Sequence, residues 1–292
     1  MKTILIPVDF SQDSLNSCKY AISLVGKEEL TFHLFHIYND QVMVPDSSFP
    51  SGLDTDAFFN SDVIIAMKEQ AETNMSHLLK EVEAEIKQSG KTNIKLMYSL
   101  ASGDPQWEIT ETCEELQPDL MIMGTRGLGE KGFLQGSMAE KIMEKAQIPV
   151  LAVPKDYQKF HFKNLLYPTN FDKLDIHTLQ RLMALFENRS FTIHVCHFLL
   201  DGENEQANIL MDELKKAFEK ERLDGKIKFS LVASENKEEA LATFVQFNKI
   251  DLIAFLSEKK HLIKDLFRNE LHKKDFFRLE LPMLALHVKS TI

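Results

Sequence analysis

The sequence predicts an α/β protein with two tandem, doubly wound, five-stranded and mostly parallel sheets that carry helices on both faces. Two observations predict this fold class. Short apolar runs alternate with amphipathic helical patterns, which favours parallel strands joined by right-handed crossovers. The same pattern then restarts in the second half of the 292 residues, which indicates an internal duplication.

The first copy begins with a predicted buried strand over residues 3–8 and a helix over 12–25, joined by the turn Asp9-Phe10-Ser11. A second strand is expected over residues 30–38. Residues 39–60 hold two prolines, one glycine and many small polar side chains, which predicts a long loop.

The remaining elements of this copy follow in the same alternation. A long helix is expected over residues 61–89, ended by Gly90, and a third strand over 94–100. Gly103-Asp104-Pro105 opens a helix that continues to Leu116, and Pro118 precedes a fourth strand over 119–123. A helix from residue 138 and a fifth strand over 148–153 complete the copy.

The most informative stretch is DLMIMGTRGLGEKGFLQGS, residues 119–137, in which a short apolar strand runs into a loop with five glycines. Glycines let main-chain N–H groups approach a ligand closely, because they carry no Cβ. Ser137 is placed as the N-cap of the next helix, and Glu140 completes a Ser-x-x-Glu capping box. A glycine-rich turn before a helix N-terminus favours anions, so we expect phosphate to bind here.

Other interpretations of this loop have less support. Residues 127–132 spell G-x-G-x-x-G, but the dinucleotide fingerprint belongs at the first strand-helix turn and needs an acidic residue about 20 positions later. No acid stands at that distance. A P-loop is excluded because Phe133 replaces the lysine. An ordinary flexible surface loop remains the plain alternative.

Four segments of the second half repeat segments of the first. KNLLYPTNFDKLD (163–175) repeats KTILIPVDFSQDS (2–14), and FTIHVCHF (191–198) repeats FHLFHIY (32–38). IDLIAFL (250–256) repeats PDLMIMG (118–124), and LPMLALHV (281–288) repeats IPVLAVP (148–154). We therefore expect an N-terminal domain over 1–154, a polar linker over 155–162 and a C-terminal domain over 163–292.

The second copy differs where a ligand would bind. Nine of the eleven glycines precede residue 160, and the counterpart of the glycine loop, residues 257–280, contains none. Asn170 stands in place of Asp9 and offers no carboxylate. The second domain is therefore predicted to keep the fold and to have lost the site.

Composition excludes several classes of partner. The net charge of −10 and a pI near 5.5 argue against nucleic acid and anionic membranes as partners. Three scattered cysteines predict neither a disulfide framework nor a zinc site, and no apolar run reaches the length of a membrane span. With no signal peptide pattern, a cytoplasmic location is expected. His33 and His36 would point to opposite faces of a strand, so no shared metal is predicted.

These motifs resemble the universal stress protein family. Its members carry an opening strand that ends in P-[TV]-D-[FG]-S, here Pro7 to Ser11, a G-x2-G-x9-G-[ST] loop, and a closing [CI]-P-V-L-[AV]-V strand, here residues 148–153. The resemblance covers both halves and is specific in the first. It implies a Rossmann-like fold of the adenine nucleotide alpha hydrolase type that binds ATP. One departure is that eight residues, not nine, separate Gly127 from Gly136.

The resemblance also implies which residues touch the nucleotide. Those facing the nucleoside would be Pro7, Val8, Asp9 and Ile37. Those lining the ribose and phosphates would be Met123, Gly124, Arg126, Gly127, Gly136, Ser137 and Met138. Arg126 could add a charge-assisted contact to phosphate. ADP or AMP could replace ATP, and Mg²⁺ could accompany the phosphates.

The sequence thus predicts a cytoplasmic, regulatory adenine-nucleotide binder with little or no turnover, because no general base, metal cage or nucleophile is visible. An interaction scaffold without nucleotide is the alternative, and a slow ATPase is a weaker one. The apolar fifth strand would lie at a sheet edge. In the resembling family this strand pairs between domains, so the two copies are expected to pair as an intramolecular pseudo-dimer or the chain to form a homodimer.

Overall fold

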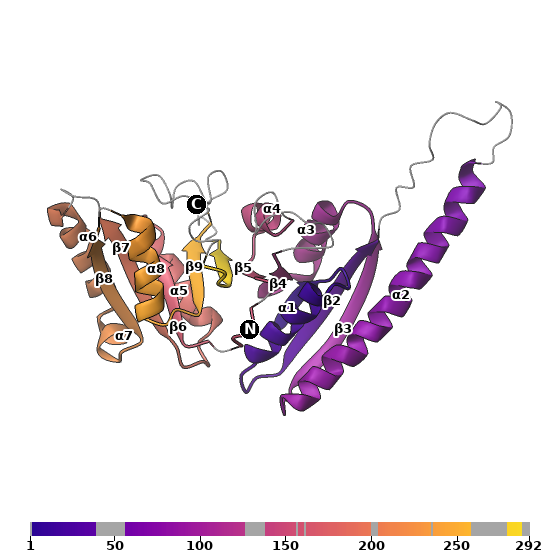
Figure 1. The fold of residues 1–292 in the computed structure, drawn as a ribbon, viewed down its shortest axis with the longest axis horizontal. Helices are drawn as coiled ribbons and strands as arrows, with labels where there is room; N and C mark the ends of the chain where they lie inside the picture. The colour runs from indigo at the N-terminus through magenta and orange to yellow at the C-terminus, as the bar shows by residue number, and fades with distance from the viewer. Residues whose placement is uncertain are drawn as a thin grey trace.

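A computed structural model gives the fold and describes residues 2–38, 56–125, 138–155, 157–160, 162–199, 204–234, 236–257 and 279–287 (Figure 1). The first half contains β1 (Thr3–Pro7), α1 (Gln12–Ser23), β2 (Leu30–Tyr38), α2 (Asp56–Gln88), β3 (Ile94–Ser102), α3 (Pro105–Leu116), β4 (Leu120–Gly124), α4 (Met138–Lys145) and β5 (Val150–Val153). The second half contains β6 (Asn164–Pro168), α5 (Asp175–Leu185), β7 (Thr192–Leu199), α6 (Asn204–Ala217), α7 (Glu219–Leu223), β8 (Ile227–Ala233), α8 (Lys237–Phe247), β9 (Leu252–Leu256) and β10 (Met283–Leu286).

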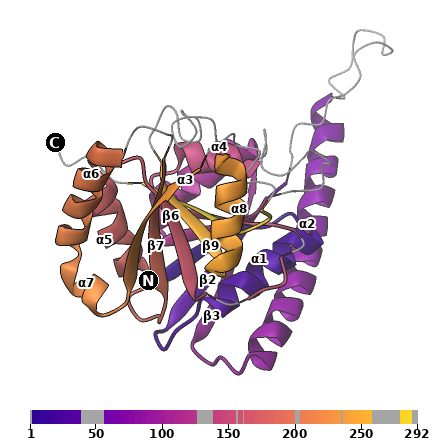
Figure 2. The same cartoon turned by 60° about the vertical axis from the view of Figure 1, so that its left-hand side comes forward.

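The strands form one continuous sheet in the order β3-β2-β1-β4-β5-β10-β9-β6-β7-β8. Neighbouring strands are parallel except at the centre, where β5 and β10 pair antiparallel with Leu151 opposite Leu284. The strand order of the second half therefore mirrors that of the first about this seam, and Figures 1 and 2 show helices on both faces. The predicted fold class is confirmed, with the two five-stranded sheets joined into one.

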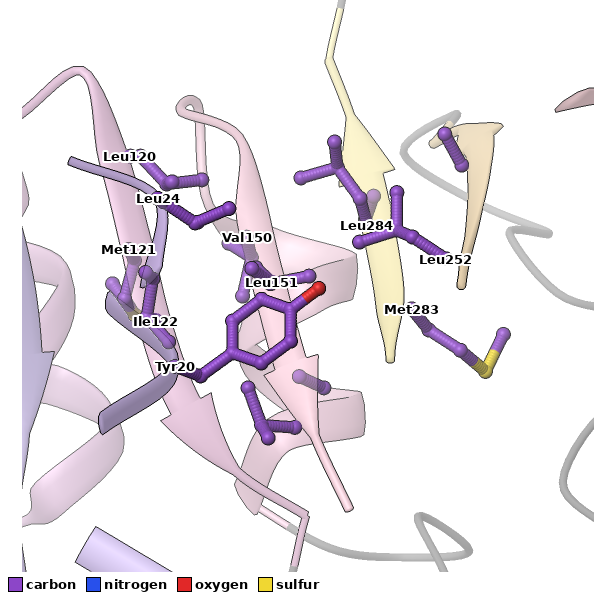
Figure 3. Close-up of a cluster of buried hydrophobic side chains, with 14 of the residues drawn as sticks. Tyr20, Leu24, Leu120, Met121, Ile122, Val150, Leu151, Leu252, Met283 and Leu284 are labelled. Carbon is purple, nitrogen blue, oxygen red and sulfur yellow. The ribbon is translucent and has the colours of Figure 1, made fainter. Parts of the chain in front are cut away.

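The hydrophobic core is continuous across the seam. Figure 3 shows Leu151 of β5 beside Leu284 of β10, with side chains of α1, β4 and β9 extending the cluster to either side. Leu151, Leu252 and Leu284 are completely buried. Because this apolar surface would otherwise face water, its burial stabilises the contact between the two halves.

Two predicted boundaries need correction. The long helix α2 begins at Asp56, inside the stretch predicted as a loop. No glycine or proline stands between Gly52 and Gly90 to interrupt the helical pattern. The strand β5 begins at Val150 and not at residue 148, since Pro149 has no N–H to donate to the ladder.

The predicted polar linker is anchored by two buried aromatic side chains, Tyr157 and Phe162. The buried Asn16 side chain of α1 lies within hydrogen-bond distance of the carbonyls of Pro154, Lys155 and Tyr157, at 3.1, 3.2 and 3.2 Å. This segment also contacts the second half, where the Tyr157 hydroxyl donates to the Asp251 carbonyl at 3.1 Å and Phe162 packs against Phe186. The domain boundaries drawn from the sequence stay a prediction.

Each half begins with the same carboxylate clamp. One oxygen of Asp119, just before β4, accepts hydrogen bonds from the main-chain N–H groups of Lys2 and Thr3 at 2.5 and 2.9 Å. One oxygen of Asp251, just before β9, accepts the equivalent bonds from Lys163 and Asn164 at 2.7 and 2.9 Å. The clamp ties the first strand of each half to the strand beside it.

Candidate functional site

The candidate site lies where the chain reverses its direction of winding in the first half. From β1 the chain proceeds to β2 on one side, whereas β4 lies on the other, so the carboxyl ends of β1 and β4 form a topological switch point. Parallel α/β sheets bind ligands in the crevice at such a point. Pairing of Pro7 with Phe35 and of Leu5 with Met121 places Pro7, Ile37 and Met123 at this carboxyl edge of three adjacent strands.

The Asp9 carboxylate is fixed by Ser11, at the N-cap of α1, and by Ser14 in the first turn of that helix. Its Oδ1 accepts hydrogen bonds from the N–H and hydroxyl of Ser11, at 3.1 and 2.5 Å, and from the Ser14 hydroxyl at 2.7 Å. The Ser14 oxygen in turn accepts from the Asp9 N–H at 2.8 Å. Phe10 between them has a φ of 62°, which is unusual for a residue other than glycine. The turn is therefore held in one conformation with its carboxylate at the strand end.

His36 joins the ends of β1 and β2. Its Nδ1 lies 2.7 Å from the Val8 carbonyl oxygen, which can only accept, so Nδ1 carries the proton and donates. The imidazole packs against the Phe10 ring, with ring centroids 4.1 Å apart and the planes tilted by 39°. Burial lowers the pKa of His36, although the bond to Val8 and the charge of Asp9 oppose that shift. A neutral His36 therefore braces the Asp9 turn from the neighbouring strand.

The other side of the switch point consists of the end of β4 and the start of α4. Met123 is buried, and Gly124 pairs with Val153 of β5. Thr125 follows with its side chain buried, and its hydroxyl has no hydrogen-bond partner among the described residues. Met138 begins α4, as predicted. Arg126, Gly127, Gly136 and Ser137 lie outside the described residues, so the glycine loop and its capping box stay predictions.

The far end of α4 is held by the second half. The Met143 carbonyl accepts a hydrogen bond from the Ser257 hydroxyl at 3.1 Å and lies 3.0 Å from His287 Nε2. Ser257 Oγ and His287 Nε2 are 2.6 Å apart. All three residues are buried. The helix that follows the glycine loop is thus fixed to the ends of β9 and β10.

Comparison with known proteins identifies the family. The model of the universal stress protein family matches residues 1–154. The chain belongs to the universal stress protein family. It is 32% identical to Universal stress protein MJ0531 of Methanocaldococcus jannaschii over 155 residues, which cover 53% of this chain and 82% of that protein. It is 24% identical to Universal stress protein G of Escherichia coli O157:H7 over 153 residues, covering 52% of this chain and 98% of that protein.

A solved structure shares the fold of the whole chain. A universal stress protein from Archaeoglobus fulgidus superposes with a TM-score of 0.70 and 18% sequence identity, over 99% of this chain and 97% of that one. The second half of this universal stress protein therefore has a structural counterpart, although the family model matches only the first.

The second half keeps the histidine brace and changes the carboxylate. His197 Nδ1 donates to the Thr169 carbonyl at 2.6 Å, and its ring stacks on Phe171, whose φ is 60°. Asn170 occupies the position of Asp9. A carboxylate, Asp175, instead takes the position of Ser14, where it accepts from the hydroxyls of Tyr167, at 2.6 Å, and of Thr169. The acid of this half is therefore buried in the interior, and this burial raises the pKa of Asp175.

Sequence reasoning missed four polar residues of this region: Ser14, His36, Ser257 and His287. His33 and His36 have separate partners, since His33 Nε2 lies 2.7 Å from Ser99 Oγ. Only the recurrence of His36 as His197 in the second copy could have indicated a common role. Ser257 carries no sequence signal, because its partner on α4 is a main-chain carbonyl 114 residues away. Ser14 lies only five residues after Asp9, but a serine in the first turn of a helix is commonplace and does not indicate a bond to that carboxylate.

Other features of the described residues bear on ligands. A pocket of about 430 Å³ lies between the end of α2 and the start of β3, lined by Glu83, Ile86, Lys87, Gly90, Lys91, Thr92, Ile94 and Leu96. It sits at the amino-terminal edge of the strands, opposite the edge where such sheets bind ligands. Within the described ranges, no group of three or more His, Cys, Asp or Glu is placed to hold a metal, and no helix is long and apolar enough to cross a bilayer.

Proposed function

We propose that this universal stress protein is a cytoplasmic stress-response protein whose first half binds ATP, or the related ADP or AMP, as a regulatory ligand with little or no turnover. The observation that carries the proposal is the placement of Pro7, Asp9, Ile37, Met123 and Gly124 at one switch point. Pro7, Ile37, Met123 and Gly124 belong to the three adjacent strands β1, β2 and β4, and Asp9 follows β1.

Each side of the switch point would hold a different part of the nucleotide. The Asp9 turn offers a carboxylate fixed by Ser11 and Ser14, which suits the hydroxyls of a ribose. The main chain at Ile37 would meet the base. Gly124, Met138 and the predicted loop residues would approach the phosphates, where the α4 dipole favours negative charge. Mg²⁺ bound with the phosphates would supply the remaining positive charge.

Binding is expected in the first half only. The second half has Asn170 in place of Asp9, and its nearby acid, Asp175, is buried and bonded to Tyr167 and Thr169. Calorimetric titration with ATP should therefore give one site per chain.

Matched variants test the assignment. Asp9→Asn copies the second-half residue into the first half and should weaken ATP binding by about tenfold, the loss of one charge-assisted hydrogen bond. Asn170→Ala changes the equivalent position of the second half and should leave ATP affinity unchanged. Wild-type protein that shows neither binding heat nor a thermal shift at millimolar ATP would refute the proposal and favour an interaction scaffold. Phosphate release above background that is lost in Asp9→Ala would point to a slow ATPase.

A further inference from the structure

The helix α4 receives a buried polar anchor from the other half of the molecule. Its Met143 carbonyl is approached by Ser257 Oγ at 3.1 Å and by His287 Nε2 at 3.0 Å, and the two side chains contact each other at 2.6 Å. Ser257 and His287 are only 5% and 6% exposed, so water cannot replace these bonds easily. A buried carbonyl with two such partners fixes both the position and the rotation of the helix.

The first half carries different residues at the two positions of this pair. Ser257 follows β9 as Thr125 follows β4, and His287 follows β10 as Pro154 follows β5. A proline side chain has no hydrogen-bonding atom, so the first half cannot offer the histidine part of the pair. The asymmetry matches the asymmetry of the site, because only the first half carries the glycine loop that leads into α4.

We propose that Ser257 and His287 are positioning residues for the nucleotide site, acting through α4. The inference rests on the proposed nucleotide function. The helix has eight residues, about two turns, so a displacement at Met143 reaches its first residue, Met138, almost undiminished. The second half thus sets the position of the main-chain groups that meet the phosphates, and it does so without touching the ligand.

This role predicts that changes to the pair lower the affinity for ATP and leave the affinity for adenosine nearly unchanged. Adenosine uses the β1 and β2 side of the site, which Ser257 and His287 do not contact, whereas the phosphates depend on α4. His287→Leu and Ser257→Ala should each lower ATP affinity by up to about tenfold and leave adenosine affinity within about twofold of wild type. His287→Gln should restore most of the ATP affinity, because its amide can donate to the Met143 carbonyl.

The matched control is another contact between the two halves. Arg189 of the second half donates to the Ser23 carbonyl at the end of α1, at 3.1 Å. This contact does not involve α4. Arg189→Ala should leave both affinities unchanged. If it lowers ATP affinity as much as His287→Leu, or if His287→Leu weakens ATP and adenosine equally, the positioning role is wrong and the pair only stabilises the fold.

Hydrogen exchange of the nucleotide-free protein separates this inference from the proposed function. The α4 amides should exchange faster in His287→Leu and Ser257→Ala than in wild type, and at the wild-type rate in Arg189→Ala. Unchanged α4 exchange in His287→Leu overturns the inference even if the wild-type chain binds ATP. Wild-type chain that binds no ATP refutes the proposed function, and faster α4 exchange would then still support the anchoring.

Discussion

The serine that fixes Asp9 offers the sharpest test of how the fold prepares the site. Ser14 Oγ donates to Asp9 Oδ1 at 2.7 Å and accepts from the Asp9 N–H at 2.8 Å, and Ser14 is only 4% exposed. Ser14→Ala removes both bonds and leaves the Asp9 N–H without its partner. The unfolding free energy should fall by about 1–3 kcal/mol, the cost of a buried polar group that loses its hydrogen bond.

Nucleotide affinity should fall with it. Without Ser14 the Asp9 carboxylate loses one of the donors that hold it, so part of the binding energy is used to keep the carboxylate in place. A cost of about 1.4 kcal/mol corresponds to tenfold weaker ATP binding. Urea denaturation gives the change in stability, and calorimetric titration gives the change in affinity.

A second serine of α1 provides the matched control. Ser17 is also fully buried, but its hydroxyl only donates back to the Asp13 carbonyl at 2.9 Å, within the helix. Ser17→Ala should therefore cost less than about 0.5 kcal/mol, since alanine has the higher helix propensity. If Ser14→Ala and Ser17→Ala change stability and ATP affinity equally, the turn is not what holds Asp9 and the reasoning fails.

Two further predictions concern the fold itself. Asp251→Ala should lower the unfolding free energy by about 2–3 kcal/mol, because it leaves two main-chain N–H groups beside a buried position without an acceptor. Asp119→Ala, at the exposed equivalent clamp, should cost less than about 1 kcal/mol, since water replaces the carboxylate. Burial lowers the pKa of His33 below 6.5, so the unfolded chain binds its proton first and stability should fall as pH drops through about 6.5. His33→Gln should flatten that slope, by at most about 1.4 kcal/mol per pH unit.

Urea denaturation, which measures the free energy of unfolding, tests both the clamp prediction and the His33 prediction. Equal losses in Asp251→Ala and Asp119→Ala would contradict the role of burial. A slope between pH 7 and 5 that is the same in His33→Gln and wild type would contradict the role of His33.

The sequence predicted the order and type of the elements because apolar runs of distinct period are local signals. Pro7, Asp9, Gly124 and Met138 stand at strand ends and at a helix start, and such boundaries are marked by turn residues in the sequence itself. The start of α2 at Asp56 was missed because prolines 45 and 50 suggested a break that extends further than it does. Tyr157 and Phe162 were hidden in a linker whose other residues are polar.

Contacts between distant segments were beyond sequence reasoning. Ser257 and Met143 are 114 residues apart, and nothing local to either indicates the other. The bond from His36 to Val8 depends on the register of β1 against β2, which a single sequence does not fix. The supporting residues of a candidate site are therefore the hardest to predict from a sequence.

Comparison of the two halves separates what the fold requires from what the ligand requires. Both halves contain a histidine that donates to a carbonyl just after the first strand and packs against a phenylalanine with positive φ. These pairs are His36 with Phe10 and His197 with Phe171. Because the second half keeps this brace without the Asp9 carboxylate or the glycines, the brace belongs to the fold. Asp9 and the glycine loop, present only in the first half, belong to the proposed ligand. The Ser257 and His287 pair, which contacts the Met143 carbonyl of the first half and is replaced there by Thr125 and Pro154, is then best explained as a contribution of the second half to that same site.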